Sequence, residues 1–151
     1  LDPAGFVKGW AVERTSRHFD ATGLKNWYVS LGGDMQMGDP PQSSYLQDGW
    51  KVGIANPIRP GEVVAALSMQ RGAIATSGTS ERGRHIIDPR SGKGSDYWSS
   101  VTVTGPSLTW ADAFATTAFV IGESGLEWVH QFEGYAALGI RADGSLVKVQ
   151  R

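Results

Sequence analysis

The sequence predicts an α+β fold in which an antiparallel sheet is covered by helices. Two observations lead to this fold class. Short segments with the residue alternation of strands follow one another closely, and turn residues separate them. Helical patterns stand apart from these segments, one near the start of the chain and a pair in its last third. A chain of 151 residues with 20 glycines is long enough for a single domain with a sizeable core and many turns.

The first helix is expected from about Val7 to Thr22, because residues of one face recur there at helical spacing and Gly23 follows as a stop signal. A strand over Trp27–Leu31 comes next, and a Gly-Gly-Asp turn ends it. Residues 38–49 are rich in Gly, Pro, Ser and Gln, so we expect them to form an exposed loop.

The middle of the chain contains most of the expected strands. Apolar runs and alternating patterns predict them at Trp50–Ala55, Val63–Met69, Ala73–Thr76, His85–Ile87 and Ser100–Thr104. The last third begins with a helix from about Thr109 to Gly122, which carries an apolar stripe. A further helix is expected over Ser124–Phe132, because Ser124 and Glu127 have the spacing of a capping box. The chain then ends as a hairpin, with its turn at Asp143-Gly144.

Composition excludes several classes of function. The net charge is −1, which argues against a broad electrostatic surface for nucleic acid or an anionic membrane. The absence of cysteine excludes disulfides, thiolate metal sites and thiol nucleophiles. The sequence has no run of 18 apolar residues, so we expect no membrane span in this chain.

One candidate for chemistry is the segment His85-Ile86-Ile87-Asp88-Pro89-Arg90-Ser91-Gly92. Histidine has the side chain best suited to proton transfer near neutral pH. Strand alternation places His85 and Ile87 on one face and Ile86 and Asp88 on the other. The alternative is a strand that enters an Asp-Pro turn, with His85 only at its edge.

A second candidate is the pair Asp112 and Thr116, whose i, i+4 spacing puts both oxygens on one helix face. A carboxylate and a hydroxyl suit a hard cation such as Mg²⁺ or Ca²⁺ beside a phosphate. The alternative is structural, because Thr109 and Asp112 also have the spacing of a helix cap.

A third candidate is a set of glycine-containing turns that could present backbone N–H groups to phosphate oxygens. The set comprises Gly5 and Gly9, with Lys8 between them, then Gly32-Gly33-Asp34 and Thr76-Ser77-Gly78. These turns do not match the spacing of a P-loop or of a dinucleotide-binding fingerprint, so each is a weak signal alone.

In order along the chain, five segments together resemble the FAD:protein FMN transferase (ApbE) family. Residues 2–12 resemble its D-x-x-G-x-x-K-G-[YW]-A-V segment, Gly32-Gly33-Asp34 its G-G-D turn, and residues 75–78 its [ST]-[ST]-G strand end. Residues 85–92 resemble its H-[IVL]-[IL]-D-P-x-[TS]-G signature, with Ser91 in place of the more usual Thr. Residues 111–116 resemble its A-D-x-x-[AS]-T helix. Glu13 stands where Asp is common, at a helix position that we expect to be exposed.

The resemblance implies a T-fold-like α+β arrangement and an Mg²⁺-dependent enzyme, with Ca²⁺ or Mn²⁺ as alternative cations. Such an enzyme transfers FMN from FAD to a Thr or Ser hydroxyl of a target protein and releases AMP. The implied partners are FAD and a target such as a redox-pump subunit or a flavoprotein reductase.

The resemblance also implies roles for individual residues. Asp112, Thr116 and the backbone carbonyl near Gly5 would bind the metal, and His85 would accept the proton of the hydroxyl. The implied cofactor-binding residues are Lys8, Gly32, Gly33, Asp34, Ser77, Gly78 and Ile86.

Family members usually carry well over a hundred residues before the position of Asp2. We therefore expect residues 1–151 to form a single domain, the C-terminal part of a flavin transferase whose N-terminal part is absent. Two other functions stay open: an FAD pyrophosphatase that yields FMN and AMP, and a non-catalytic FAD-binding module. For the full-length protein, the resemblance favours an extracytoplasmic or membrane-anchored location.

Overall fold

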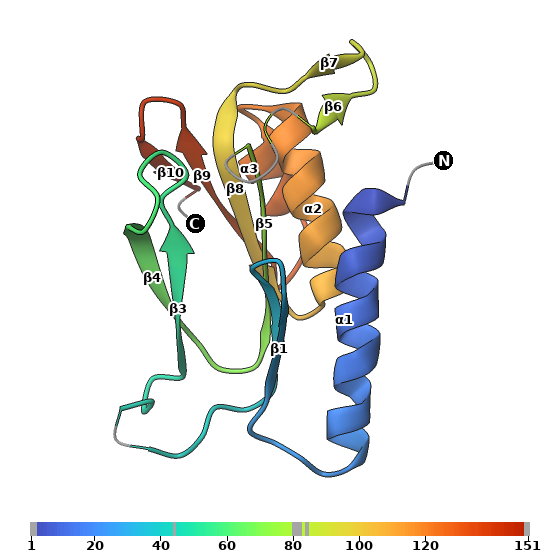
Figure 1. Ribbon diagram of the computed structural model, residues 1–151, viewed down its shortest axis with the longest axis vertical. Helices are drawn as coiled ribbons and strands as arrows, with labels where there is room; N and C mark the ends of the chain where they lie inside the picture. The colour runs from blue at the N-terminus through green and yellow to red at the C-terminus, as the bar shows by residue number, and fades with distance from the viewer. Residues whose placement is uncertain (1–2, 44, 80–82, 84, 150–151) are drawn as a thin grey trace.

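A six-stranded antiparallel sheet forms the centre of the molecule (Figure 1). The computed structural model describes residues 3–43, 45–79, 83 and 85–149. Across the sheet the strands lie in the order β1 (Tyr28–Leu31), β2 (Asp34–Met37), β5 (Gly72–Gly78), β8 (Trp98–Gly105), β9 (Ala136–Arg141) and β10 (Leu146–Lys148). Neighbouring strands are antiparallel throughout, which confirms the predicted α+β fold class.

Different elements cover the two faces of this sheet. Helices α1 (Ala4–Ala21), α2 (Leu108–Ile121) and α3 (Gly125–Val129) lie on one face, and the hairpin of β3 (Trp50–Ala55) and β4 (Val63–Met69) lies on the other (Figure 1). The helix α1 runs antiparallel to α2, so its first turns reach the end of the sheet from which the small hairpin β6 (Ile87–Asp88) and β7 (Lys93–Gly94) projects.

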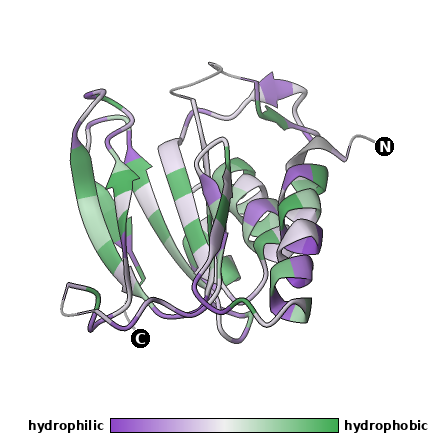
Figure 2. Cartoon of the chain, turned by 60° about the horizontal axis from the view of Figure 1, so that its bottom comes forward, coloured by the Kyte–Doolittle hydropathy of each residue, from purple (hydrophilic) through white to green (hydrophobic). Residues whose placement is uncertain are grey.

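Strand alternation divides the apolar residues between two cores. On β5, Ala73 and Ala75 face the helices, whereas Ile74 between them faces the β3–β4 hairpin. Small residues on the helix side let α2 lie close to the sheet, and its buried Phe119 belongs to that core. On the other face, Val52 and Ile54 of β3 pack against the sheet; Figure 2 shows hydrophobic residues on both this hairpin and the strands behind it.

Several element predictions are confirmed and others are wrong. Strands β3 and β4 have the predicted bounds. Helix α1 begins at Ala4, before the predicted start. Helix α3 ends at Val129 rather than near Phe132, and the expected capping box does not form, because the Ser124 side chain makes no cap hydrogen bond.

Among the described residues, no helix is both long and apolar enough to span a membrane.

Strand β2 was not predicted. Gly32 and Gly33 form a two-residue turn between paired Leu31 and Asp34, and both glycines have positive φ, +59° and +87°. Such a turn matches the twist of a tight hairpin and requires residues that tolerate positive φ. The Gly-Gly-Asp segment therefore ends one strand and also starts the next, with Asp34 as the first residue of β2.

Candidate functional site

Three charged side chains from three elements meet between the helices and the sheet. Lys8 of α1 places its Nζ 2.6 Å from Oδ2 of Asp34 on β2 and 3.9 Å from Oδ1 of Asp112 on α2. Both aspartates are buried, with 1% of Asp34 and 4% of Asp112 exposed. The Lys8 side chain is 35% exposed, so the group opens to solvent along the lysine.

Backbone groups fix both carboxylates. The Thr76 N–H of β5 donates to Oδ1 of Asp34 over 3.0 Å, and the Gly9 N–H of α1 donates to Oδ2 of Asp112 over 3.1 Å. These donors belong to a strand and to a helix, so regular secondary structure holds one oxygen of each carboxylate in place. The arrangement is a preorganised pair of carboxylates with one lysine beside it.

The pKa of Asp112 is raised to about 6. Burial is the largest cause, and the negative charge of Asp34 adds to it, whereas Lys8 and the Gly9 N–H act in the opposite direction. Because ionisation of the Asp112 carboxyl group is costly in the free protein, a cation that binds near it would stabilise the ionised form. This electrostatic state is typical of a functional site.

Thr116 lies one helical turn beyond Asp112 on the same helix face. Its Oγ1 is 2.9 Å from Ser77 Oγ on β5. Gly5 of α1 is so close that an added Cβ would lie 3.3 Å from Thr116 Oγ1. The structure therefore brings Gly5 beside Thr116 and puts Asp112 on the adjoining turn of α2.

The available donors fit a hard divalent cation. A carboxylate, a hydroxyl and a backbone carbonyl are the oxygen ligands that Mg²⁺ and Ca²⁺ take, and Mg²⁺ characteristically adds phosphate oxygens. Within the described ranges, no three His, Cys, Asp or Glu side chains group as a metal site. A cation here would therefore depend on mixed oxygen donors, with Asp112, Thr116 and the Gly5 carbonyl as the protein's share.

The alternative interpretation of Asp112 as a helix cap is wrong. Helix α2 begins at Leu108 with Ser107 as its N-cap, so Asp112 lies inside the helix. Its hydrogen bond comes from Gly9 of another helix, not from the start of its own.

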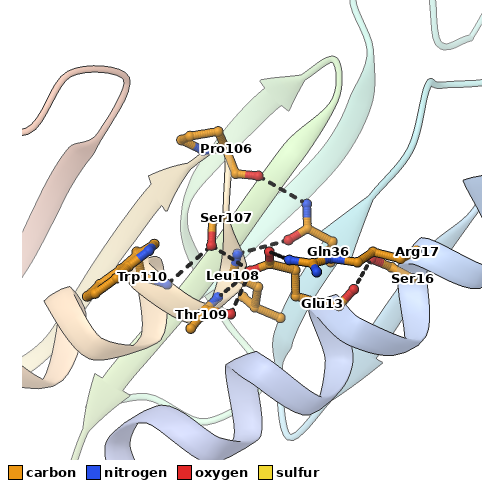
Figure 3. Close-up of polar contacts among 9 residues, drawn as sticks. All are labelled: Glu13, Ser16, Arg17, Gln36, Pro106, Ser107, Leu108, Thr109 and Trp110. Carbon is orange, nitrogen blue, oxygen red and sulfur yellow. Dashed lines mark hydrogen bonds and ion pairs between the residues drawn. The ribbon is translucent and has the colours of Figure 1, made fainter.

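The N-terminus of α2 is capped instead by its own N-cap residue and by side chains from β2 and α1 (Figure 3). Gln36 of β2 accepts the Leu108 N–H over 2.9 Å, and Glu13 of α1 accepts the Thr109 N–H over 3.1 Å. Ser107 Oγ accepts the Trp110 N–H over 3.5 Å. Glu13 also accepts hydrogen bonds from the Ser107 and Thr109 hydroxyls, at 2.5 and 2.6 Å.

Glu13 is therefore not the exposed residue that the sequence suggested. Its side chain is only 17% exposed, and it joins α1 to the start of the helix that carries Asp112. Burial alone would raise the pKa of Glu13, but the hydrogen bonds from Ser107 and Thr109 outweigh it and lower the pKa.

We expect Glu13→Gln to lower the free energy of unfolding by about 1–2 kcal/mol at neutral pH, because a charged cap becomes a neutral one. A lowered pKa contributes stability above the unfolded-state pKa, and this stability is lost as the pH falls through the folded-state value. The difference between variant and wild type in urea unfolding should therefore shrink in acid. Glu133→Gln, at an exposed position, is the control; equal losses in the two variants would contradict the role of Glu13.

Gly9 allows α1 to approach α2. A Cβ at this position would lie 2.6 Å from the Leu108 carbonyl oxygen and 3.0 Å from Asp112 Cβ. The closest obstacle is helix backbone, which cannot rotate away as a side chain can. Close contact between the helices thus depends on the absence of a side chain at Gly9.

Gly9→Ala should lower the free energy of unfolding by about 1–3 kcal/mol, because the helices must separate. Helix propensity alone predicts the opposite sign, a gain of roughly 1 kcal/mol. Gly5→Ala is the matched control: its Cβ would meet only the movable Thr116 side chain at 3.3 Å, so its loss should be smaller. Urea unfolding of both variants measures the difference, and a more stable Gly9→Ala variant would refute the packing argument.

His85 precedes β6 and is exposed, with Nδ1 3.0 Å from the Gly83 carbonyl oxygen. Ile86 packs against the helix-side core, while Ile87 is half exposed, so the burial of these residues follows the predicted alternation. Ser95 connects this hairpin to α2: its N–H donates to the Ile86 carbonyl and its Oγ donates to the Phe119 carbonyl. Ser95 therefore joins the segment of His85 by hydrogen bonds to α2, the helix that carries Asp112 and Thr116.

A cleft of about 400 Å³ lies beside this hairpin, between it and the end of α2. Its charged lining residues are Asp88, Lys93, Asp96 and Glu123. The cleft does not include any of the residues predicted to bind the metal or the cofactor.

The predicted cofactor-binding residues lie on several different elements and turns. Gly32 and Gly33 lie exposed at the β1–β2 turn. Gly78 ends β5, where a Cβ would lie 2.8 Å from the Ser99 carbonyl oxygen, so this glycine has a packing reason of its own. Lys8, Asp34 and Ser77 belong to the contacts described above.

Sequence reasoning missed Gln36 and the role of Glu13. The alternating segment Asp34-Met35-Gln36-Met37 after a Gly-Gly pair is a hairpin signal that could have revealed β2. No local signal links Glu13 to Ser107, because the two residues are 94 positions apart.

The ApbE family model matches residues 1–138. An FAD:protein FMN transferase of Treponema pallidum is 31% identical over 95% of this chain and 44% of its own length. One from Rhodobacter capsulatus is 33% identical over 97% of this chain and 29% of its own. The crystal structure of the ApbE protein from Thermotoga maritima superposes with a TM-score of 0.84 at 28% identity, over 99% of this chain and 51% of that one.

The flavin transferase ApbE from Vibrio cholerae gives a TM-score of 0.82 at 27% identity, over 99% of this chain and 50% of that one. The chain thus spans less than half the length of these two curated relatives and about half of each solved structure.

Proposed function

Since this chain belongs to the ApbE family, we propose that it carries the metal-binding and proton-accepting residues of an FAD:protein FMN transferase. The observation that carries the proposal is the buried Asp112 carboxylate, with Thr116 on the next turn of the same helix, Gly5 beside Thr116, and Lys8 at 3.9 Å. This set of residues combines hard oxygen donors with the cation of a partly exposed lysine, which suits a pyrophosphate substrate with a divalent metal.

In the proposed reaction the hydroxyl oxygen of a Thr or Ser on the target protein attacks the FMN-side phosphorus of FAD. The bond from that phosphorus to the bridging oxygen breaks, and AMP leaves with the oxygen. The hydroxyl proton passes to the imidazole of His85, which is exposed and so accessible to an acceptor on another protein.

Asp112, Thr116 and the Gly5 carbonyl would hold the metal, which would supply positive charge to the phosphate oxygens. Lys8 would place a further positive charge at the same phosphates. The buried network around Asp34, Thr76 and Gly9 would keep these groups in place before substrate binds, so that little reorganisation is needed during the reaction.

The test is incubation of the chain with FAD, Mg²⁺ and a Thr-containing acceptor peptide, followed by mass measurement of the peptide and assay of AMP. The same assay is run on a chimera in which this chain replaces the matching 44% of the Treponema pallidum relative. Flavinylated peptide with an equal amount of AMP supports the proposal. AMP without flavinylated peptide would indicate an FAD pyrophosphatase, and FAD binding without AMP from the chimera would indicate a non-catalytic module.

A further inference from the structure

The two buried carboxylates, Asp34 and Asp112, share one lysine. The Lys8 ammonium ion-pairs with both, at 2.6 Å from Asp34 Oδ2 and 3.9 Å from Asp112 Oδ1. Two ionised carboxylates out of water are costly unless a positive charge accompanies them. In the free protein, the Lys8 ammonium of the same chain supplies a positive charge at this place.

The contacts of Asp34 explain why Lys8 stays at this place. One oxygen of Asp34 is fixed by the Thr76 N–H of the central sheet, and the other lies against the Lys8 ammonium. With only 1% of the residue exposed, Asp34 has little surface for contact with a bound molecule. Its position and burial suit an anchor for Lys8 better than a direct ligand contact.

The position of Lys8 has a consequence for any cation at Asp112. Like charges repel more strongly near a protein interior than in water, and the ammonium is 3.9 Å from Asp112 Oδ1. A divalent cation on that carboxylate must therefore bind against the charge of Lys8 or displace its ammonium toward solvent, where the side chain is already 35% exposed.

We propose that Lys8 is a built-in counter-cation of the Asp34–Asp112 carboxylate pair, anchored by Asp34, and that it lowers the affinity of the site for divalent cations. The proposal rests on the proposed function only in taking Asp112 as a cation ligand. It makes Lys8 a residue that sets metal affinity, in addition to its expected contact with phosphate.

The first measurement needs no ligand. Lys8→Met keeps an unbranched side chain that is one atom shorter and removes its charge, so the carboxylate pair loses the ammonium beside it. We expect Lys8→Met to unfold at a lower urea concentration than the wild type in metal-free buffer at neutral pH, and Lys8→Arg to recover most of the loss. Equal unfolding midpoints for Lys8→Met and wild type would overturn the proposal, whether or not the site binds metal.

The second measurement is titration of the same variants with Mn²⁺, followed by electron paramagnetic resonance of the free ion. We expect Lys8→Met to bind Mn²⁺ roughly tenfold more tightly than the wild type, which corresponds to about 1.4 kcal/mol. Lys8→Arg should bind as the wild type does. Lys51→Met, which removes an exposed lysine paired with Asp48, is the control and should leave Mn²⁺ affinity unchanged.

The outcomes separate the two proposals. Unchanged or weaker Mn²⁺ binding by Lys8→Met would overturn the counter-cation role. Removal of a lysine that only supports the structure would not increase the Mn²⁺ affinity. Absence of Mn²⁺ binding in every variant, with destabilised Lys8→Met, would instead remove the metal site from the proposed function and refute the effect of Lys8 on metal affinity.

Discussion

Asp112→Asn should reduce Mg²⁺-dependent AMP release from FAD by about 10³-fold or more, because a metal ligand contributes several kcal/mol to stabilisation of the transition state. The substitution keeps the size of the side chain and an oxygen that can accept the Gly9 N–H, but it removes the negative charge. The rate is measured on the chain and on the chimera at saturating FAD.

The same substitution should not weaken the fold in metal-free buffer. Because the pKa of Asp112 is raised to about 6, its contribution to stability is full at low pH and is lost as the pH rises through that value. The wild type should therefore lose stability between about pH 4 and pH 7, and Asp112→Asn should lose less over the same range.

Loss of activity without loss of stability is the combination that distinguishes a metal ligand from a structural aspartate. Asp48→Asn, with a side chain that is 79% exposed, is the control and should change neither quantity. An Asp112→Asn variant that retains AMP release, or that unfolds more readily than the wild type above pH 7, would contradict the proposed role.

His85→Ala should lower the rate of transfer to a Thr-containing acceptor by about 10²–10⁴-fold, the usual contribution of a positioned general base. FAD affinity should change little, because His85 is exposed and its ring contacts a loop carbonyl rather than the Asp112 group. Fluorescence of the flavinylated peptide measures the transfer, and fluorescence polarisation of FAD measures the binding.

The control for His85 is His18→Ala, which removes the exposed histidine in the last turn of α1. Transfer that persists in His85→Ala at the wild-type rate would show that another group accepts the proton. A parallel fall in transfer and in FAD affinity would assign His85 to binding instead.

The structure confirms the fold class and some of the strands that the sequence predicted. Strands β3 and β4 were predicted to the residue, because their alternation is local and their ends are marked by Gly, Pro and Asn. Strand β2 was missed because two of its four residues, Asp34 and Gln36, are polar yet face the helices. Polar residues on a buried face can be explained only when their hydrogen-bond or ion-pair partners in other elements are known.

In the candidate site too, some features could be predicted from local sequence patterns and others needed the structure. The i, i+4 spacing of Asp112 and Thr116 put both oxygens on one helix face, and this was visible in the sequence. The cap interpretation of Asp112 was equally compatible with that spacing. It fails in the structure because Ser107, Glu13 and Gln36 already cap the helix.

By itself, the sequence determined the α+β class, the motifs shared with the ApbE family and the helix face that presents Asp112 and Thr116. Only the tertiary structure decided that Asp34 and Asp112 are buried together, that Lys8 lies between them and that Glu13 caps a helix 94 residues away. The physical reason is that spacing and propensity act within a few residues, whereas charge pairing and burial depend on which distant segments pack together.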